Sequence, residues 1–210
     1  MTMTYNSLFA QIRNYLQRSD AETLAQIPNF ISQAEQRICR ESKNIGLEQV
    51  VTSAFIATDS VIAKPARWRR SISMNFGTGE DLSDINQMYL RSYEFLRNYW
   101  RNPDQVGIPK FYADYSYTHF LVAPTPDANY PFELTYLELP EPITPNNQIN
   151  WITNFAPDVL LYASLLESAP FVKNDDRLSM WLSMYERGIT SLNVQDDMRK
   201  TDRTDNRNSD

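Results

Sequence analysis

The chain has 210 residues, of which 42% are hydrophobic and 22% charged, which is enough for a buried core and excludes global disorder. Its net charge of −6 argues against a protein whose main task is to grip a phosphate backbone, because such proteins usually carry a basic face. A single cysteine, Cys39, excludes an internal disulfide and a cysteine-based zinc site. Nothing approaches about 18 consecutive apolar residues or has the pattern of an ordinary signal peptide, so we expect a soluble protein made in a reducing compartment.

The first helix is predicted from Leu8, Ile12 and Leu16, which recur at helical spacing, with Asn6 or Ser7 as its expected cap. The chain then breaks at residues 19–20 before a second helical pattern.

The second helix is expected to carry Pro28 in its first turn, where a missing N–H costs nothing. Its apolar face includes Phe30, Ala34 and Ile38, and Gly46 is the predicted end.

The middle of the chain is predicted to form strands, because short runs of β-branched and aromatic residues alternate with turn residues. The runs are 50–56, 61–62, 71–76, 85–90, 111–115, 119–122 and 132–137. A short helix is expected near 91–101, with Tyr93, Leu96 and Trp100 on one stripe. Residues 116–118 and 124–129 are predicted turns, and three prolines within 140–145 form a stiff exit linker.

Apolar residues at helical spacing recur near Asn154, which is the expected cap of a helix that ends at Pro170. Asp175 and its neighbours then start another helix that runs to Leu192. The last segment, 196–210, holds one apolar residue and is expected to be mobile unless a partner orders it.

The predicted fold class is therefore α+β. An antiparallel four-helix bundle is formed by both chain ends, residues 1–45 and 150–195. An antiparallel β-rich module is inserted at 46–149, and 196–210 is a flexible polar C-terminal tail.

Residues suited to chemistry are few. His119 is the one histidine and lies within a predicted strand, which favours a structural role. Gly77 and Gly79 lack the third glycine and the lysine of a phosphate-binding loop, so a turn is expected there. We predict no catalytic, cofactor-binding or metal-binding residue, no cofactor, and no enzyme activity. A hydrolase with paired carboxylates is the enzyme alternative that remains open.

The densest basic cluster outside the C-terminal segment is Arg67, Trp68, Arg69 and Arg70. It is a candidate for a subunit contact or for contact with DNA in a channel, through stacking and phosphate pairing. The acidic total charge favours the subunit contact. A nucleic-acid-binding module that uses this cluster is the alternative function.

Several stretches along nearly the whole chain give it a resemblance to a known family. The matching stretches are IPNFI (27–31), AEQRI (34–38) with Arg40 and Glu41, RSYEFL (91–96), PKFYA (109–113), LVAPTPD (121–127), Tyr130 with LTY (134–136), Asn150 with Trp151, PDVLLYASLLE (157–167), Trp181 and Tyr185. In their order and spacing these stretches resemble the head-to-tail adaptor proteins of tailed bacteriophages, also called head-completion or tail tubular A-like proteins.

The resemblance implies a structural virion protein at the head–tail junction, assembled in the bacterial host cytoplasm. Its expected partners are further copies in a ring, usually dodecameric, the portal protein, and tail or nozzle proteins. Double-stranded DNA would pass without sequence-specific binding, and no membrane is involved. The resemblance also implies a C-terminal extension that reaches the portal, for which Arg199, Lys200, Arg203 and Arg207 are the candidate contacts.

Overall fold

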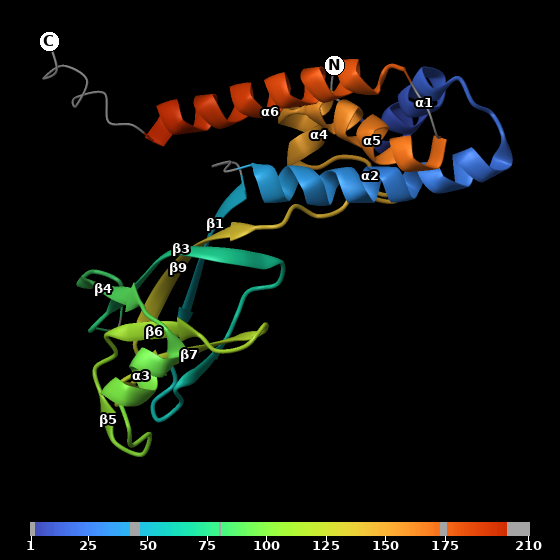
Figure 1. Ribbon diagram of the computed structural model, residues 1–210. Coiled ribbons are helices and arrows are strands. Elements are labelled where there is room, and N and C mark those ends of the chain that lie inside the picture. Colours follow the sequence, from blue (N-terminus) through green and yellow to red (C-terminus); the bar gives the residue numbers. More distant parts are fainter. Residues whose placement is uncertain (1–2, 43–46, 80, 173–175, 201–210) are drawn as a thin grey trace, which may run out of the picture. The chain divides into compact units, whose positions relative to one another are not determined.

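The computed structural model describes residues 3–42, 47–79, 81–172 and 176–200, and it has a mixed α+β fold (Figure 1). The chain divides into two compact units, one made of residues 1–47 and 140–210 and the other of residues 48–139. We call them the helical unit and the β unit. Within the described part of the chain, no helix is both long and apolar enough to cross a membrane.

The helical unit takes helices from both ends of the sequence. They are α1 (Tyr5–Leu16), α2 (Ala21–Glu41), α4 (Trp151–Phe155), α5 (Pro157–Val172) and α6 (Leu178–Lys200). Helix α5 packs against α1, α2, α4 and α6, and Leu160 and Leu165 on it are fully buried. The unit therefore has one core shared by both chain ends and centred on α5, while the antiparallel four-helix bundle stays a prediction.

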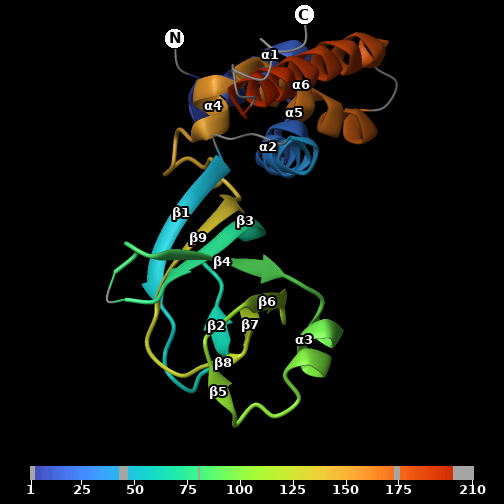
Figure 2. The same ribbon diagram turned by 90° about the vertical axis from the view of Figure 1, so that its left-hand side faces the viewer.

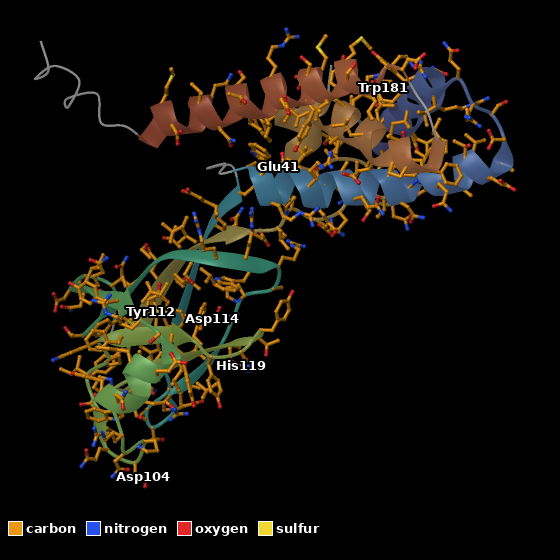
Figure 3. The ribbon with its side chains drawn as sticks, viewed as in Figure 1. Glu41, Asp104, Tyr112, Asp114, His119 and Trp181 are labelled. Carbon is orange, nitrogen blue, oxygen red and sulfur yellow. The ribbon has the colours of Figure 1, made fainter. Side chains whose placement is uncertain are left out.

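Two polar contacts join α2 to the C-terminal helices around this core. The Tyr185 hydroxyl donates a hydrogen bond of 2.7 Å to Glu41, and Arg37 pairs with Glu167 at 2.9 Å. Glu41 and the buried Trp181 are labelled in Figure 3. Since α2 and α5–α6 are far apart in the sequence, these contacts hold the two chain ends together.

The starts of the first two helices differ from the sequence prediction. Thr4 caps α1, in place of Asn6 or Ser7, and its hydroxyl accepts a hydrogen bond from the Ser7 N–H at 3.2 Å. Asp20 caps α2, so Pro28 lies inside this helix and not in its first turn. The prediction was wrong because the favourable cap and first turn at 20–23 begin the helix earlier than the proline suggested.

The later helices also correct the prediction. Asn150, not Asn154, supplies a cap, and it starts the short α4. Pro170 lies within α5, which reaches Val172. Helix α6 continues to Lys200, so residues 196–200 of the expected flexible tail are helical, because extending a formed helix costs little. Gly46, Asn174 and Asp175 lie outside the described residues.

The β unit holds a large curled sheet with strand order β1-β9-β3-β4-β6-β7-β2 (Figure 2). Its strands are β1 (Glu48–Ala54), β2 (Val61–Ala63), β3 (Trp68–Gly77), β4 (Ile85–Leu90), β6 (Phe111–Asp114), β7 (His119–Ala123) and β9 (Pro131–Glu138). Strands β5 (Val106–Gly107) and β8 (Thr125–Pro126) form a second, two-stranded sheet. Helix α3 (Tyr93–Tyr99) lies between β4 and β5 in sequence.

The sheet is mostly but not wholly antiparallel. Strand β4 pairs with β6 in parallel, because the chain crosses over through α3 between them. The segment 124–129, expected to be only a turn, contributes β8. The hairpin predicted at 116–118 is confirmed by the antiparallel pairing of β6 with β7. The core of the unit lies on the inner face of the curled sheet, where Phe55 stacks on Phe132 with ring centroids 4.7 Å apart.

A buried carboxylate ties α2 to the linker that follows the β unit in sequence. One Glu35 oxygen accepts hydrogen bonds from the Ile143 N–H at 3.2 Å and from the Asn150 side chain at 2.7 Å. Asn150 also donates to the Glu141 carbonyl at 3.0 Å and caps α4. Burial raises the pKa of Glu35 to about 7, against the opposing effect of the two hydrogen bonds. The residue therefore positions residues 141–150 against α2.

The raised pKa of Glu35 predicts a pH dependence of folding stability. A carboxyl that binds its proton more tightly in the folded state destabilises the fold as pH rises from about 4.5 to about 7. Glu35→Gln keeps an acceptor oxygen but no charge. We expect it to raise the free energy of unfolding by about 1–3 kcal/mol at pH 8 and to change it little at pH 4.

Urea unfolding of both proteins at the two pH values measures this difference. The control is Glu22→Gln, which alters an exposed glutamate on the same helix. An equal effect of Glu35→Gln at both pH values would contradict the prediction.

Candidate functional site

A cluster of exposed aromatic side chains lies where β4, α3 and β6 meet. Ser92 starts α3, its hydroxyl accepting a hydrogen bond from the Phe95 N–H at 3.2 Å. Of the α3 side chains only Leu96 is buried, so the helix turns its rings outward. We call the cluster the aromatic face; it consists of the exposed Tyr89, Tyr93, Phe95, Tyr99 and Tyr115, the exposed Leu90 between them, and the partly buried Phe111.

The rings of the aromatic face form two groups of contacts, one around Phe111 and the other a stacked pair of Tyr93 and Tyr115. Phe111 is at the centre, with its ring centroid 5.3 Å from Phe95, 4.9 Å from Tyr99 and 6.4 Å from Tyr89. Phe95 and Tyr99 stack at 6.0 Å, one helical turn apart. Such packing restricts the rotamers of the rings, so that a partner would meet an ordered surface.

Arginines border the rings. The Arg97 Nε donates a hydrogen bond of 3.0 Å to the Tyr93 hydroxyl, and its guanidinium lies 5.1 Å from that ring's centroid. The Arg91 guanidinium lies 5.9 Å from the Phe95 ring. Arg101 and Lys110 are also exposed nearby in sequence. Tyrosine, phenylalanine and arginine are enriched where proteins bind proteins.

The exposure of these rings distinguishes the face from a core. Tyr89 is 51% exposed, Tyr99 43% and Phe95 40%. Contiguous apolar patches on monomers mark binding sites, because exposing them to water is unfavourable. The sequence prediction placed Tyr93, Leu96 and Trp100 on one stripe and missed the face. The signal was there in the aromatic residues on both β4 and β6, which flank α3.

Contacts within the chain engage members of the predicted basic cluster at 67–70. Arg67 pairs with Glu138 of the same unit at 2.8 Å. Trp68 is half-buried, with its ring edge-on to Phe120 at 5.5 Å and its N–H donating to Ser71 at 3.2 Å. Arg69 is half-buried and has a polar partner, whereas Arg70 is exposed. The strip of stacking and phosphate contacts expected for nucleic acid is thus interrupted by contacts within the chain.

A buried lysine holds the β6–β7 hairpin. The Lys64 side chain is 2% exposed, and its ammonium lies 3.9 Å from the centroid of the Trp68 ring. It forms an ion pair with Asp114 and donates a hydrogen bond of 2.7 Å to the Ser116 carbonyl. The turn presents Tyr117 at its tip, 92% exposed.

His119 lies at the base of this hairpin, near Asp114 in Figure 3. Its Nδ1 forms a hydrogen bond of 2.8 Å with the Thr118 hydroxyl. Cys39, the other candidate for nucleophilic chemistry, is buried in the helical unit. Histidine and cysteine therefore lie in different units.

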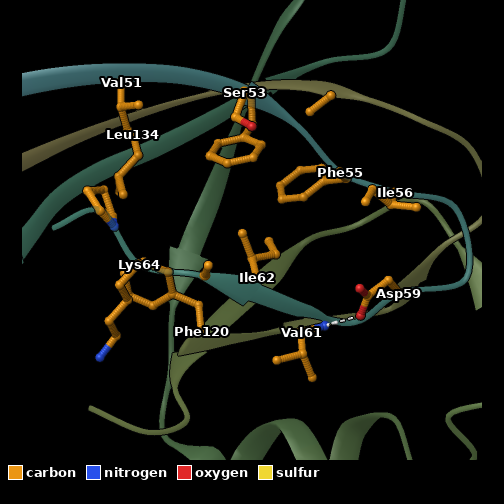
Figure 4. Close-up of a pocket in the computed structure, with 14 residues that line it drawn as sticks. Val51, Ser53, Phe55, Ile56, Asp59, Val61, Ile62, Lys64, Phe120 and Leu134 are labelled. Carbon is orange, nitrogen blue, oxygen red and sulfur yellow. Dashed lines mark hydrogen bonds between the residues drawn. The ribbon is translucent and has the colours of Figure 1, made fainter. Parts of the chain in front are cut away.

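An apolar pocket of about 310 Å³ lies between β1 and β2, the two edge strands of the curled sheet (Figure 4). Val51 and Ile62 line it from opposite strands, and Phe120 and Leu134 also line it. Its charged lining residues are Lys64, which is paired with Asp114, and Asp59, which accepts a hydrogen bond from the Val61 N–H at 2.9 Å. Among the described residues, no group of three or more histidine, cysteine or acidic side chains is placed to hold a metal ion.

The candidate portal contacts are at the C-terminal end. Arg199 and Lys200 are the last two residues of α6. Arg203 and Arg207 lie outside the described residues.

Exposed aromatic rings bordered by arginines are typical of surfaces that bind other proteins. The family model of the SU10 adaptor protein matches residues 3–208. The chain belongs to the SU10 adaptor protein family, a family of phage head–tail adaptors, which confirms the predicted resemblance. It is accordingly a structural component of a bacteriophage virion that interacts with other virion proteins. No curated protein matches the chain.

The contacts of Lys64 predict the effect of removing its charge. Lys64→Met keeps an unbranched side chain that is one atom shorter, and it leaves the Ser116 carbonyl without this donor and Asp114 without its cation. Since Asp114 is largely exposed, we expect a loss of about 1–3 kcal/mol, less than for a fully buried pair. Amide hydrogen exchange at 116–119 should accelerate.

Hydrogen exchange and urea unfolding test this expectation. Lys110→Met, at an exposed position in the same unit, is the matched control. Unchanged exchange in the hairpin of Lys64→Met would show that the lysine does not hold it.

Proposed function

We propose that this protein is a ring-forming adaptor that joins the portal of the phage head to the tail and leaves a passage for DNA. Membership of the SU10 adaptor protein family carries the proposal. The aromatic face supports it, because ring subunits must offer ordered apolar surface to neighbours. The proposed partners are further copies, in a dodecameric ring, the portal, and tail or nozzle proteins.

In this proposal the helical unit acts as an antiparallel four-helix bundle that gives each ring subunit a rigid body. Its support is the common core of helices from both chain ends, with Leu8 and Ile31 from one end and Leu160 and Trp181 from the other fully buried. Rigidity matters because a ring closes only if every subunit presents its contacts at the same angle.

The passage of DNA requires weak contact with the adaptor. The chain carries a net charge of −6, and a ring repeats that charge around its bore. Repulsion between the ring and the phosphate backbone would keep passing DNA from binding. Arg67 and Trp68, which a nucleic-acid-binding module would use, are engaged within the β unit, so the observations favour the adaptor over that alternative.

The proposed function is tested by mixing the purified protein with the portal of the same phage. Mass photometry and negative-stain images should show rings of adaptor on the portal, while the free protein stays smaller. Portal rings that bind no adaptor at micromolar concentrations would overturn the proposal.

Docking on the portal is proposed to use the basic residues at the C-terminal end. Replacing Arg199, Lys200, Arg203 and Arg207 by glutamine should weaken portal binding by at least about tenfold at low salt, because each lost cation removes an ionic contact. The difference should shrink as salt rises.

Binding isotherms at two salt concentrations measure this effect. The matched control replaces Asp202, Asp205 and Asp210 of the same segment by asparagine, which should leave binding intact or tighten it. Equal binding by the glutamine variant and the natural protein would remove the C-terminal segment from the portal contact.

A further inference from the structure

The aromatic face has a complement elsewhere in the same unit. The loop between β3 and β4 is acidic: residues 77–84 include three acidic residues and no basic one. Residues 89–112, which contain most of the face, hold four basic and two acidic residues in a chain whose net charge is −6. We call residues 77–84 the acidic loop. The two segments thus have opposite net charge.

In the described part of the acidic loop, residues 77–79 and 81–84, side chains form hydrogen bonds with one another. The Thr78 hydroxyl donates a hydrogen bond of 2.6 Å to Asp84, and the Ser83 hydroxyl donates to Asp81. Hydrogen bonds from Ser83 hold the pKa of Asp81 below its ordinary value, so that this carboxylate stays charged. A Cβ at Gly77 would lie 2.1 Å from the Asp81 carbonyl oxygen, so only glycine allows the loop to close this tightly.

The acidic loop and the aromatic face lie at opposite ends of one strand. Strand β4 leads from the loop to α3, and its six residues span about 17–20 Å. In Figure 2, α3 and the start of β4, which follows the loop, lie on opposite sides of the β unit. A copy therefore cannot cover its own face with its own loop. Head-to-tail contact requires two different surfaces on each copy, and this placement supplies them.

We propose that the aromatic face of one copy binds the acidic loop of a second copy, an inference that rests on the proposed ring function. Arg91 and Arg97 would pair with Asp81 and Asp84 at the rim. Ile85, which is 59% exposed beside the loop, would pack on the rings. Glu94 and Asp104 are the acidic residues among 89–112, and the basic residues outnumber them.

The size of the face also favours a second copy over a tightly bound separate partner. Each aromatic ring buries at most about 150–250 Å², and these rings are already partly covered by one another. Since the exposed rings are 39–51% accessible, the five of them offer on the order of 300–600 Å² to a partner, less than the roughly 800 Å² per partner of a stable complex. One contact alone would be weak, whereas many copies held on a portal would close a ring cooperatively.

The test uses charge reversal in two variants of the full chain. Arg91→Glu with Arg97→Glu changes the face, and Asp81→Lys with Asp84→Lys changes the loop. Each variant alone should form at least about tenfold fewer rings on the portal, because like charges then oppose one another at every junction. An equimolar mixture should restore rings, since alternating copies again place opposite charges at each junction.

The mixture guards against misfolding, because two misfolded variants would not rescue each other. Arg13→Glu with Arg18→Glu, exposed in the helical unit, makes the same charge change and should form rings normally. Rings formed by the face variant alone, or a mixture that fails to restore them, would overturn this contact and leave the adaptor function intact. Absence of rings with the natural protein would overturn the adaptor function as well.

Discussion

The antiparallel pairing of β1 with β9 is the constraint on which the rest of the structure depends. Glu48 is opposite Leu137 in this pair, so the chain begins and ends the β unit at neighbouring positions. The helices before and after the unit can then share one core, although about a hundred residues separate them in sequence. Without this pairing, neither chain end could cover its apolar helix faces.

Within the β unit, some side chains outside the core are held in place by contacts at the surface. The rings of Phe95 and Tyr99 pack edge-on to Phe111, and the buried Lys64 pairs with Asp114 of a surface hairpin. Fixing the rotamers of surface side chains costs conformational entropy, and the stability of the fold does not require that surface side chains be fixed. In a protein of an adaptor family, surface side chains that are already fixed lose less conformational entropy when a neighbouring protein binds. These surface features of the β unit are therefore suited to binding.

Charge contributes to function through its distribution more than through its total. The net charge of −6 is unevenly distributed, because residues 89–112 hold four basic and two acidic residues whereas residues 77–84 hold three acidic residues and no basic one. The net charge does not reveal these two regions, because their opposite charges partly cancel in the sum. A ring subunit needs such asymmetry, because its two sides must differ if copies are to join head to tail.

The sequence by itself determined the helices and most of the strands, because the periodicity of apolar residues is a local property. It also determined that residue types suited to catalysis are few, because that depends on composition alone. It misplaced helix starts at Asn6 and Asn154 and the role of Pro28, since several residues could serve as caps and packing decides among them. Only the tertiary structure decided that Arg67 is neutralised by Glu138 and that the rings of α3 face outward. Both outcomes depend on which distant strands become neighbours, and that cannot be read from spacing along the chain.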